Sequence, residues 1–113
     1  MSSISISTHV LDTASGLPVA GVPVSLAQLE SDLWTELAAA ATDADGRIGE
    51  LVPDGPALPG GRYRVRFDLE GAGSIERSWY PEVAIVVDLA DDAGHVHVPL
   101  LLAPYGYTTY RGS

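Results

Sequence analysis

The sequence of 113 residues contains no cysteine, which excludes a disulfide framework, a thiolate nucleophile and a zinc site built on cysteine. It also has no apolar run of the length needed to span a bilayer. Its first residues, Met-Ser-Ser-Ile-Ser-Ile-Ser, lack the basic and apolar regions of a secretory signal peptide. We therefore expect a soluble, cytoplasmic protein with no membrane partner.

Basic residues are scarce: six Lys and Arg stand against fifteen Asp and Glu, for a net charge of −9. This balance argues against nucleic acid as a partner, because a phosphate backbone attracts basic surfaces. The main effect expected of the negative charge is solubility. A chain of this length predicts a single domain over residues 1–113.

Short strands joined by turns are predicted for most of the chain, whose 12 glycines and 8 prolines are spread along it. Apolar and polar residues alternate from Ile4 to Val10 and from Arg62 to Leu69, as in half-buried strands. Further strands are predicted to start at Val22 and to cover residues 83–89, 96–102 and 107–111. Seven or eight such strands indicate an all-β sandwich of two sheets.

For two segments the sequence does not decide the secondary structure. Ser31–Thr42 is rich in Ala, Leu and Glu and favours a helix by propensity, although strand formation depends strongly on context. Glu70–Ser78 is the one long gap between predicted strands, and a short helix or a loop is expected there. At most one short helix is therefore predicted.

Two of the three histidines are predicted to point away from the core. His9 and His97 each fall on the polar side of an alternating strand. A histidine there is available for proton transfer near neutral pH, although an isolated histidine in such a position is more often an ordinary surface residue. His95 lies on the same strand face as His97, so a zinc site with His9 as third ligand is an alternative. The spacing of that third ligand is not defined by the sequence, which makes the zinc signal weak.

Arg47 directly follows the acidic turn Asp43-Ala44-Asp45-Gly46. Its side chain can pair with those aspartates, which as an exposed ion pair would contribute little. Alternatively it can bind an anion or stabilise an oxyanion.

The last four residues, Tyr110-Arg111-Gly112-Ser113, combine an aromatic ring, a guanidinium, a permissive glycine and a hydroxyl beside the terminal carboxylate. Such groups are typical of ligand recognition rather than of a frayed polar tail.

Four blocks together resemble one family, the 5-hydroxyisourate hydrolases, which form the enzymatic branch of the transthyretin-like proteins. The blocks occur in family order and are Thr8-His9-Val10-Leu11-Asp12-Thr13, Thr42 to Arg47, Trp79-Tyr80-Pro81-Glu82-Val83, and His97-Val98-Pro99-Leu100-Leu101-Leu102 continuing into the Tyr-Arg-Gly-Ser end. The resemblance implies a transthyretin-like sandwich in which Trp34 to Thr42 is a strand. It also implies that the first strand and the last two share one sheet.

The same resemblance implies an activity, a site and an assembly. The activity is hydrolysis of 5-hydroxyisourate to 2-oxo-4-hydroxy-4-carboxy-5-ureidoimidazoline in urate catabolism, without a metal or other cofactor. The implied assembly is a homotetramer built as a dimer of dimers, with the site in a channel between dimers. The implied catalytic residues are His9, Arg47, His97 and Ser113, and the implied substrate-binding residues are His9, Arg47, Tyr110 and Arg111.

Several points stay open at this stage. Either His9 or His97 can be the general base, and Ser113 can act through its hydroxyl or its carboxylate. His95 is not a fixed position of the family and is set aside. The rival function is a non-catalytic carrier of a small ligand, as in the vertebrate proteins of the same fold.

Overall fold

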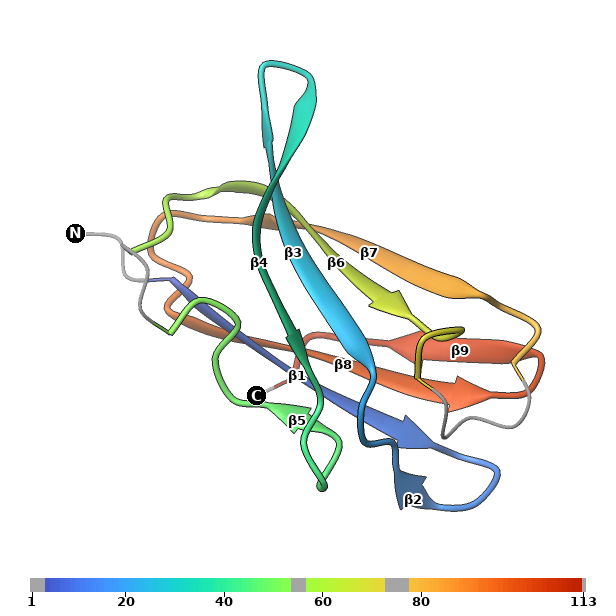
Figure 1. Ribbon diagram of the computed structural model, residues 1–113. Coiled ribbons are helices and arrows are strands. Elements are labelled where there is room, and N and C mark those ends of the chain that lie inside the picture. The colour runs from blue at the N-terminus through green and yellow to red at the C-terminus, as the bar shows by residue number, and fades with distance from the viewer. Residues whose placement is uncertain (1–3, 54–56, 73–77, 113) are drawn as a thin grey trace.

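The computed structural model describes residues 4–53, 57–72 and 78–112, which form a sandwich of two β-sheets (Figure 1). One sheet has the order β2-β1-β8-β9, with β5 also paired to β1, and the other has the order β4-β3-β6-β7. The first contains β1 (Ser5–Asp12), β2 (Leu17–Pro18), β5 (Arg47–Ile48), β8 (His95–Ala103) and β9 (Gly106–Thr109). The second contains β3 (Pro23–Glu30), β4 (Leu33–Ala41), β6 (Gly61–Asp68) and β7 (Glu82–Leu89). The predicted all-β sandwich is confirmed, as is the sharing of one sheet by the first and last strands.

Two very short strands were not predicted from the sequence. β2 lies where a turn was expected, and β5 consists of Arg47 and Ile48 alone. Both pair with β1 in the antiparallel direction. Two residues are too few to show an alternating pattern, so only the pairing with β1 reveals them.

The alanine-rich segment is a strand, as the family resemblance implied. β4 pairs with β3 along its length, with an irregularity between Leu26 and Ala27. Ser31 and Asp32 connect the two strands with positive φ angles of 50° and 66°, as in the tight turns of β-hairpins. Pairing with β3 therefore outweighs the helix propensity of the alanines. The hairpin extends beyond the rest of the sandwich in Figure 1.

The core lies between the sheets and follows the predicted alternation. Tyr63, Val65, Phe67 and Leu69 are all buried. From the opposite sheet, Ile6 and Val10 of β1 and alternate residues of β8 join the same cluster. The last strand ends at Thr109, two residues before the predicted limit, and an isolated bridge between Gly112 and His97 follows it.

The expected loop or helix over Glu70–Ser78 lies partly outside the described residues. Its first part, Glu70 to Ala72, is a turn. In the described ranges no helix is long and apolar enough to cross a membrane.

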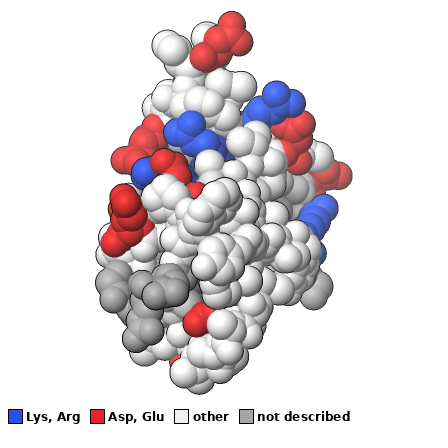
Figure 2. Space-filling view, turned by 90° about the vertical axis from the view of Figure 1, so that its right-hand side faces the viewer, with Lys and Arg blue, Asp and Glu red and all other residues white. Residues whose placement is uncertain are grey.

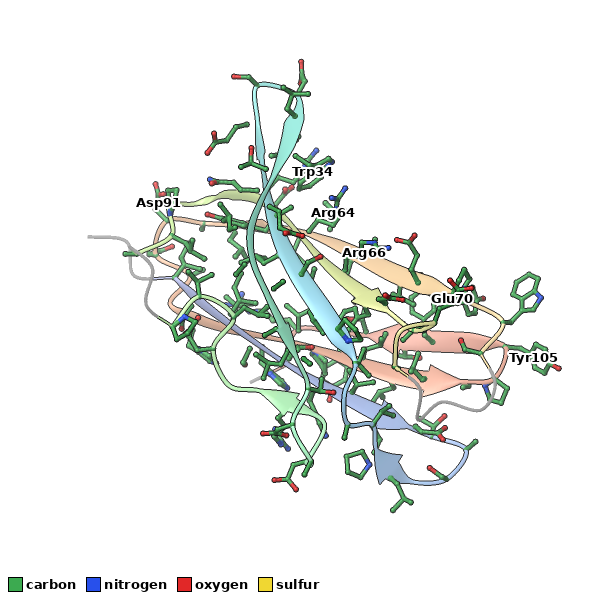
Figure 3. The ribbon with its side chains drawn as sticks, viewed as in Figure 1. Trp34, Arg64, Arg66, Glu70, Asp91 and Tyr105 are labelled. Atoms are coloured by element: carbon green, nitrogen blue, oxygen red, sulfur yellow. The ribbon has the colours of Figure 1, made fainter. Side chains whose placement is uncertain are left out.

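The arginines of β6 are occupied on the outer face of their own sheet. Arg62 pairs with Asp88 at 2.7 Å and Arg66 with Glu82 at 2.6 Å. The Arg64 guanidinium lies 4.7 Å from the centroid of the Trp34 ring, on the side of the molecule seen in Figure 3. Figure 2 shows the resulting surface, in which acidic and basic side chains are intermixed. The two ion pairs neutralise Arg62 and Arg66 locally, whereas Arg64 lies over an aromatic ring.

Candidate active site

The candidate site lies on the outer face of the β2-β1-β8-β9 sheet. In β1, Ile6 and Val10 point into the core, so Ser7 and His9 between them point outward. In β8, Val96 and Val98 are buried, and His95 and His97 take the outer face. The outward orientation predicted for His9 and His97 is therefore observed.

The parallel pairing of β1 and β8 brings these outward side chains together. Ser7 is the partner of His97, and His9 is the partner of Pro99. The Ser7 hydroxyl lies 2.8 Å from Nδ1 of His97. Because Ser7 occupies Nδ1, Nε2 is the nitrogen of His97 that remains available for other contacts.

Arg47 reaches the site through the acidic turn and β5. The Asp43 carboxylate accepts hydrogen bonds from the backbone N–H groups of Asp45 and Arg47, both at 2.9 Å. Gly46 has a φ of 73°, and a Cβ there would lie 2.6 Å from the Val10 carbonyl oxygen, so the turn requires glycine.

The turn places Arg47 directly opposite His9 in the β1–β5 pairing. The aspartates of the turn thus hold its backbone. Among the described residues the salt bridges are those of Arg62 and Arg66, and the Arg47 guanidinium forms none with that part of the chain.

The three groups influence one another electrostatically. Burial lowers the pKa of His9, and the charge of Arg47 lowers it further. A hydrogen bond with the Asp45 backbone and the nearby Asp43 carboxylate oppose this lowering of the His9 pKa. Burial is also the largest cause that lowers the pKa of His97, followed by the charges of Arg47 and His9. Both imidazoles are therefore held toward the neutral form, which a general base requires.

The end of the chain lies against His97. The Gly112 N–H donates a hydrogen bond to the His97 carbonyl oxygen at 2.9 Å. A Cβ on Gly112 would lie 2.5 Å from Cδ2 of His97, so only glycine allows this approach. Ser113, the remaining predicted catalytic residue, lies outside the described residues.

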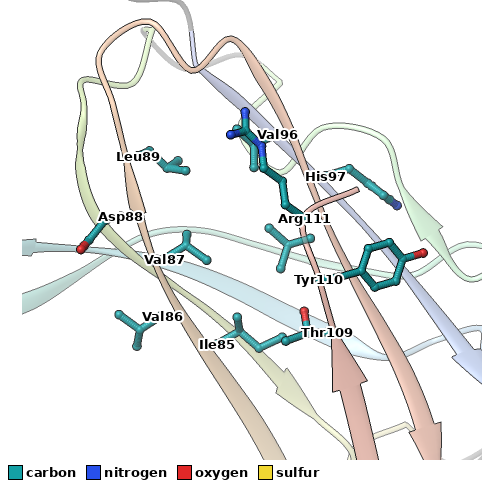
Figure 4. A pocket seen from close by; sticks show the side chains of 11 residues that line it. Ile85, Val86, Val87, Asp88, Leu89, Val96, His97, Thr109, Tyr110 and Arg111 are labelled. Carbon is teal, nitrogen blue, oxygen red and sulfur yellow. The ribbon is translucent and has the colours of Figure 1, made fainter. Parts of the chain in front are cut away.

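The two predicted binding residues of the tail lie on different sides of the strand. In Figure 4 the Tyr110 ring points away from β7, as His97 does, whereas Arg111 extends toward Val96. Tyr110 is 55% exposed. The Tyr110 side chain thus lies on the same side as His97, and the Arg111 side chain points the other way.

A cavity of about 400 Å³ lies at the open side of the sandwich, between β7 and the β9 end of the first sheet. It is lined mainly by apolar residues, and Arg111 borders it (Figure 4). His97 and Tyr110 are also among its lining residues, although the His97 ring points away from β7. The cavity therefore adjoins the histidine cluster on the His97 side.

His95 has contacts that the sequence did not indicate. Its Nδ1 lies 2.6 Å from the Ser5 hydroxyl and its Nε2 lies 2.9 Å from the Ser7 hydroxyl. Both ring nitrogens thus face serines. The described residues contain no group of three side chains arranged to hold a metal ion. Strand alternation placed His95 and Ser7 on the outer face, but only the β1–β8 register shows that they meet.

Two sheets of this topology, with a histidine and arginine cluster on one outer face, define a transthyretin-like sandwich. A sequence model described as the HIUase/Transthyretin family matches residues 6–112. The chain belongs to this family.

Similar proteins come from animals and bacteria. A 5-hydroxyisourate hydrolase of Mus musculus is 43% identical over 112 residues, which cover 96% of this chain and 94% of the mouse protein. A 5-hydroxyisourate hydrolase of Salmonella dublin is 42% identical, over 96% of this chain and 80% of that protein.

Solved structures share the fold. The Klebsiella pneumoniae 5-hydroxyisourate hydrolase superposes with a TM-score of 0.79 at 37% identity, covering 96% of this chain and 99% of that one. Sea bream transthyretin in complex with thyroxine superposes with a TM-score of 0.84 at 30% identity, covering 95% and 93% of the two chains.

Proposed function

We propose that this protein hydrolyses 5-hydroxyisourate to 2-oxo-4-hydroxy-4-carboxy-5-ureidoimidazoline, a step of urate catabolism. The relatives named 5-hydroxyisourate hydrolase support the substrate, since they match nearly the whole of this chain. The observation that carries the proposal is the convergence of His9, Arg47 and His97 from three strands of one sheet. A neutral imidazole beside a guanidinium supplies the base and the cation that hydrolysis of a ring amide needs.

In the proposed mechanism a neutral histidine, either His9 or His97, removes a proton from water as the water oxygen attacks the ring carbonyl. The new carbon–oxygen bond converts the carbonyl oxygen to an oxyanion, which Arg47 and groups of the terminal segment stabilise. Collapse of this intermediate breaks the carbon–nitrogen bond of the ring. The imidazolium then returns its proton to the departing nitrogen, and the carbonyl carbon becomes the carboxyl group of the product.

Each remaining site residue has a proposed task. Tyr110 borders the substrate on the His97 side, and Ser113 contributes its hydroxyl or its carboxylate at the end of the same segment. Arg111 was predicted to bind substrate, and it lines the same cavity as His97 and Tyr110. Protein groups alone carry the reaction, so no cofactor or metal is proposed.

We propose further that the active form is a homotetramer built as a dimer of dimers. β7 and β9 end their respective sheets, and such unpaired edges can pair with a second copy. Tyr105, Tyr107 and Tyr110 are also large and exposed. A second dimer covering the outer face of the β2-β1-β8-β9 sheet would exclude water from the site and strengthen its electrostatics. Sedimentation combined with kinetics across a dilution series tests this assembly, and a fully active monomer would contradict it.

A spectrophotometric assay tests the proposed reaction. Urate oxidase generates 5-hydroxyisourate from urate, and the decay of that product is followed with and without this protein. Acceleration of the decay by catalytic amounts of the protein is expected. Unchanged decay, together with binding of a small apolar ligand, would favour a carrier instead.

A further inference from the structure

Four polar side chains form a continuous hydrogen-bonded row beside the site. The row starts at the Ser5 hydroxyl, 2.6 Å from Nδ1 of His95. From Nε2 of His95 it continues for 2.9 Å to the Ser7 hydroxyl, and then for 2.8 Å to Nδ1 of His97. No step in the row exceeds an ordinary hydrogen-bond distance.

The row follows from the pairing of β1 with β8. In this parallel pair, Ser5 is the partner of His95 and Ser7 is the partner of His97. Side chains two residues apart share one face of a strand, so two serines meet two histidines alternately. Ser7 is only 7% exposed, which means that the two imidazoles, rather than water, are the partners of its hydroxyl.

The donors and acceptors of this row are coupled. A serine hydroxyl has one hydrogen to donate, and a neutral imidazole has one N–H and one lone pair. If the Ser7 hydroxyl donates to His95, it can only accept from His97, and His97 must then carry its hydrogen on Nδ1. If it donates to His97 instead, the hydrogen of His97 must be on Nε2.

These two hydrogen-bonding arrangements leave a different group on Nε2 of His97, the ring nitrogen that faces the site. With the hydrogen on Nδ1, the Nε2 atom has a free lone pair and can accept a proton. Arg47 favours this order, because a guanidinium only donates hydrogen bonds and carries a fixed positive charge. The positive charge of Arg47 acts on His97. This charge interacts more favourably with a lone pair of the His97 ring than with an N–H group, which is itself a donor.

We propose that Ser7 and His95 are positioning residues for His97, which hold its ring in place with the hydrogen on Nδ1 and the lone pair on Nε2. In this arrangement His97 Nδ1–H donates to the Ser7 hydroxyl, which donates to Nε2 of His95, and Nδ1–H of His95 donates to the Ser5 hydroxyl. Each of these three hydrogens then has one acceptor within the row, and the Ser5 hydroxyl keeps its own hydrogen for a partner outside the row. The catalytic benefit rests on the proposed function, whereas the arrangement of hydrogens does not.

Nitrogen-15 NMR of the ring nitrogens tests the arrangement without any substrate. The protein is labelled at histidine, and the long-range proton–nitrogen correlations of His97 identify its tautomer. The Nδ1–H form is expected in the wild type, and a shift toward Nε2–H is expected in Ser7→Ala and His95→Ala. An Nε2–H tautomer in the wild type, or a tautomer unchanged in both variants, would overturn the proposal.

Kinetics on the same variants test the catalytic benefit. Ser7→Ala and His95→Ala are expected to lower kcat by roughly 10- to 100-fold with KM little changed, because a misaligned catalytic group costs about that much. Ser7→Thr retains the hydroxyl and His95→Gln retains an acceptor, so both are expected to restore most of the loss. Ser25→Ala, the same change on the outer sheet face formed by β3, serves as the matched control and is expected to behave as wild type.

The two measurements separate this proposal from the proposed function. His95 is exposed, so His95→Ala remains informative even if Ser7→Ala disturbs β1. Full kcat in a folded His95→Ala protein would show that the row does not position His97. A wild type with the Nδ1–H tautomer but no hydrolysis of 5-hydroxyisourate would contradict the proposed function and leave the tautomer assignment intact.

Discussion

Gly112 lies directly against the imidazole of His97, 15 residues earlier in the chain. Its N–H donates to the His97 carbonyl oxygen at 2.9 Å, and a Cβ at this position would lie 2.5 Å from Cδ2 of the ring. The opposite contact of the ring, at Nδ1, is the Ser7 hydroxyl. His97 is therefore held between β1 and the terminal segment.

Gly112→Ala is expected to lower kcat by about 100-fold, since a methyl group must displace either the ring or the terminal segment. The melting temperature should change little, because Gly112 is near the end of the chain and outside the core. Gly106→Ala is the matched control, since a Cβ there meets nothing within 4 Å. Equal activity of both variants would show that the close contact with His97 does not matter for catalysis.

His9→Ala, Arg47→Ala and His97→Ala are each expected to fold and to lose most of their activity. Loss of an acid–base group costs about 10²- to 10⁴-fold, and loss of an oxyanion donor costs about 10²- to 10³-fold. Arg66→Ala, which removes an exposed arginine paired with Glu82 on the other sheet, should retain full kcat/KM. His97→Ala could instead unfold most of the protein while the remaining folded fraction kept the specific activity of the wild type. That result would refute the proposed site.

The pH dependence of activity should reflect two histidines that stay neutral below the ordinary pKa of 6.5. The value of kcat/KM is expected to fall only as the pH drops through these lowered pKa values. NMR titration should show both pKa values rising toward 6.5 in Arg47→Ala, because a cationic neighbour is removed. Midpoints that do not move in this variant would argue against close contact with Arg47.

The free energy of unfolding should also depend on pH through His9 and His97. A lowered pKa in the folded state means that the unfolded state binds more protons between the two values. The stability that His9 and His97 contribute in this way is complete above the pKa of the unfolded state, about 6.5. It is lost as the pH falls through their lowered pKa values in the folded state. Denaturant unfolding of wild type and His97→Ala across this range measures it, and the variant should show the weaker dependence on pH.

Residues added after Ser113 should be far more damaging than residues added before Met1. A C-terminal tag moves the terminal carboxylate and adds bulk beside His97, whereas removal of residues 110–113 deletes little of the core, whose last β8 member is Leu102. The truncated protein is thus expected to fold with a modest loss of melting temperature and a severe loss of kcat. Equal activity of N-tagged, C-tagged and truncated proteins would identify this segment as an ordinary tail.

Activity should survive dialysis against a strong chelator. The proposed mechanism uses protein groups only, and the ring nitrogens of His95 face Ser5 and Ser7. The rate before and after dialysis, with and without added zinc, measures any metal requirement. A large loss that zinc restores would favour the alternative site of His9, His95 and His97.

Much of the fold could be predicted from local patterns. The alternation in β6 correctly predicted that Tyr63, Val65 and Phe67 are core residues, because a strand with one buried face must place its apolar residues on that face. The same rule placed His9 and His97 on the outer face. The segment that includes β4 was ambiguous by propensity, since its helix-forming alanines become a strand only through pairing with β3.

The sequence by itself determined which side chains face outward, because alternation along a strand is a local property of the backbone. Only the tertiary structure decided which of these side chains meet. The parallel register of β1 and β8 brings Ser7 to both His95 and His97, and the pairing of a two-residue strand brings Arg47 to His9. Strand order and register depend on how two sheets bury their apolar faces together, over separations of up to 90 residues, and no local pattern encodes them.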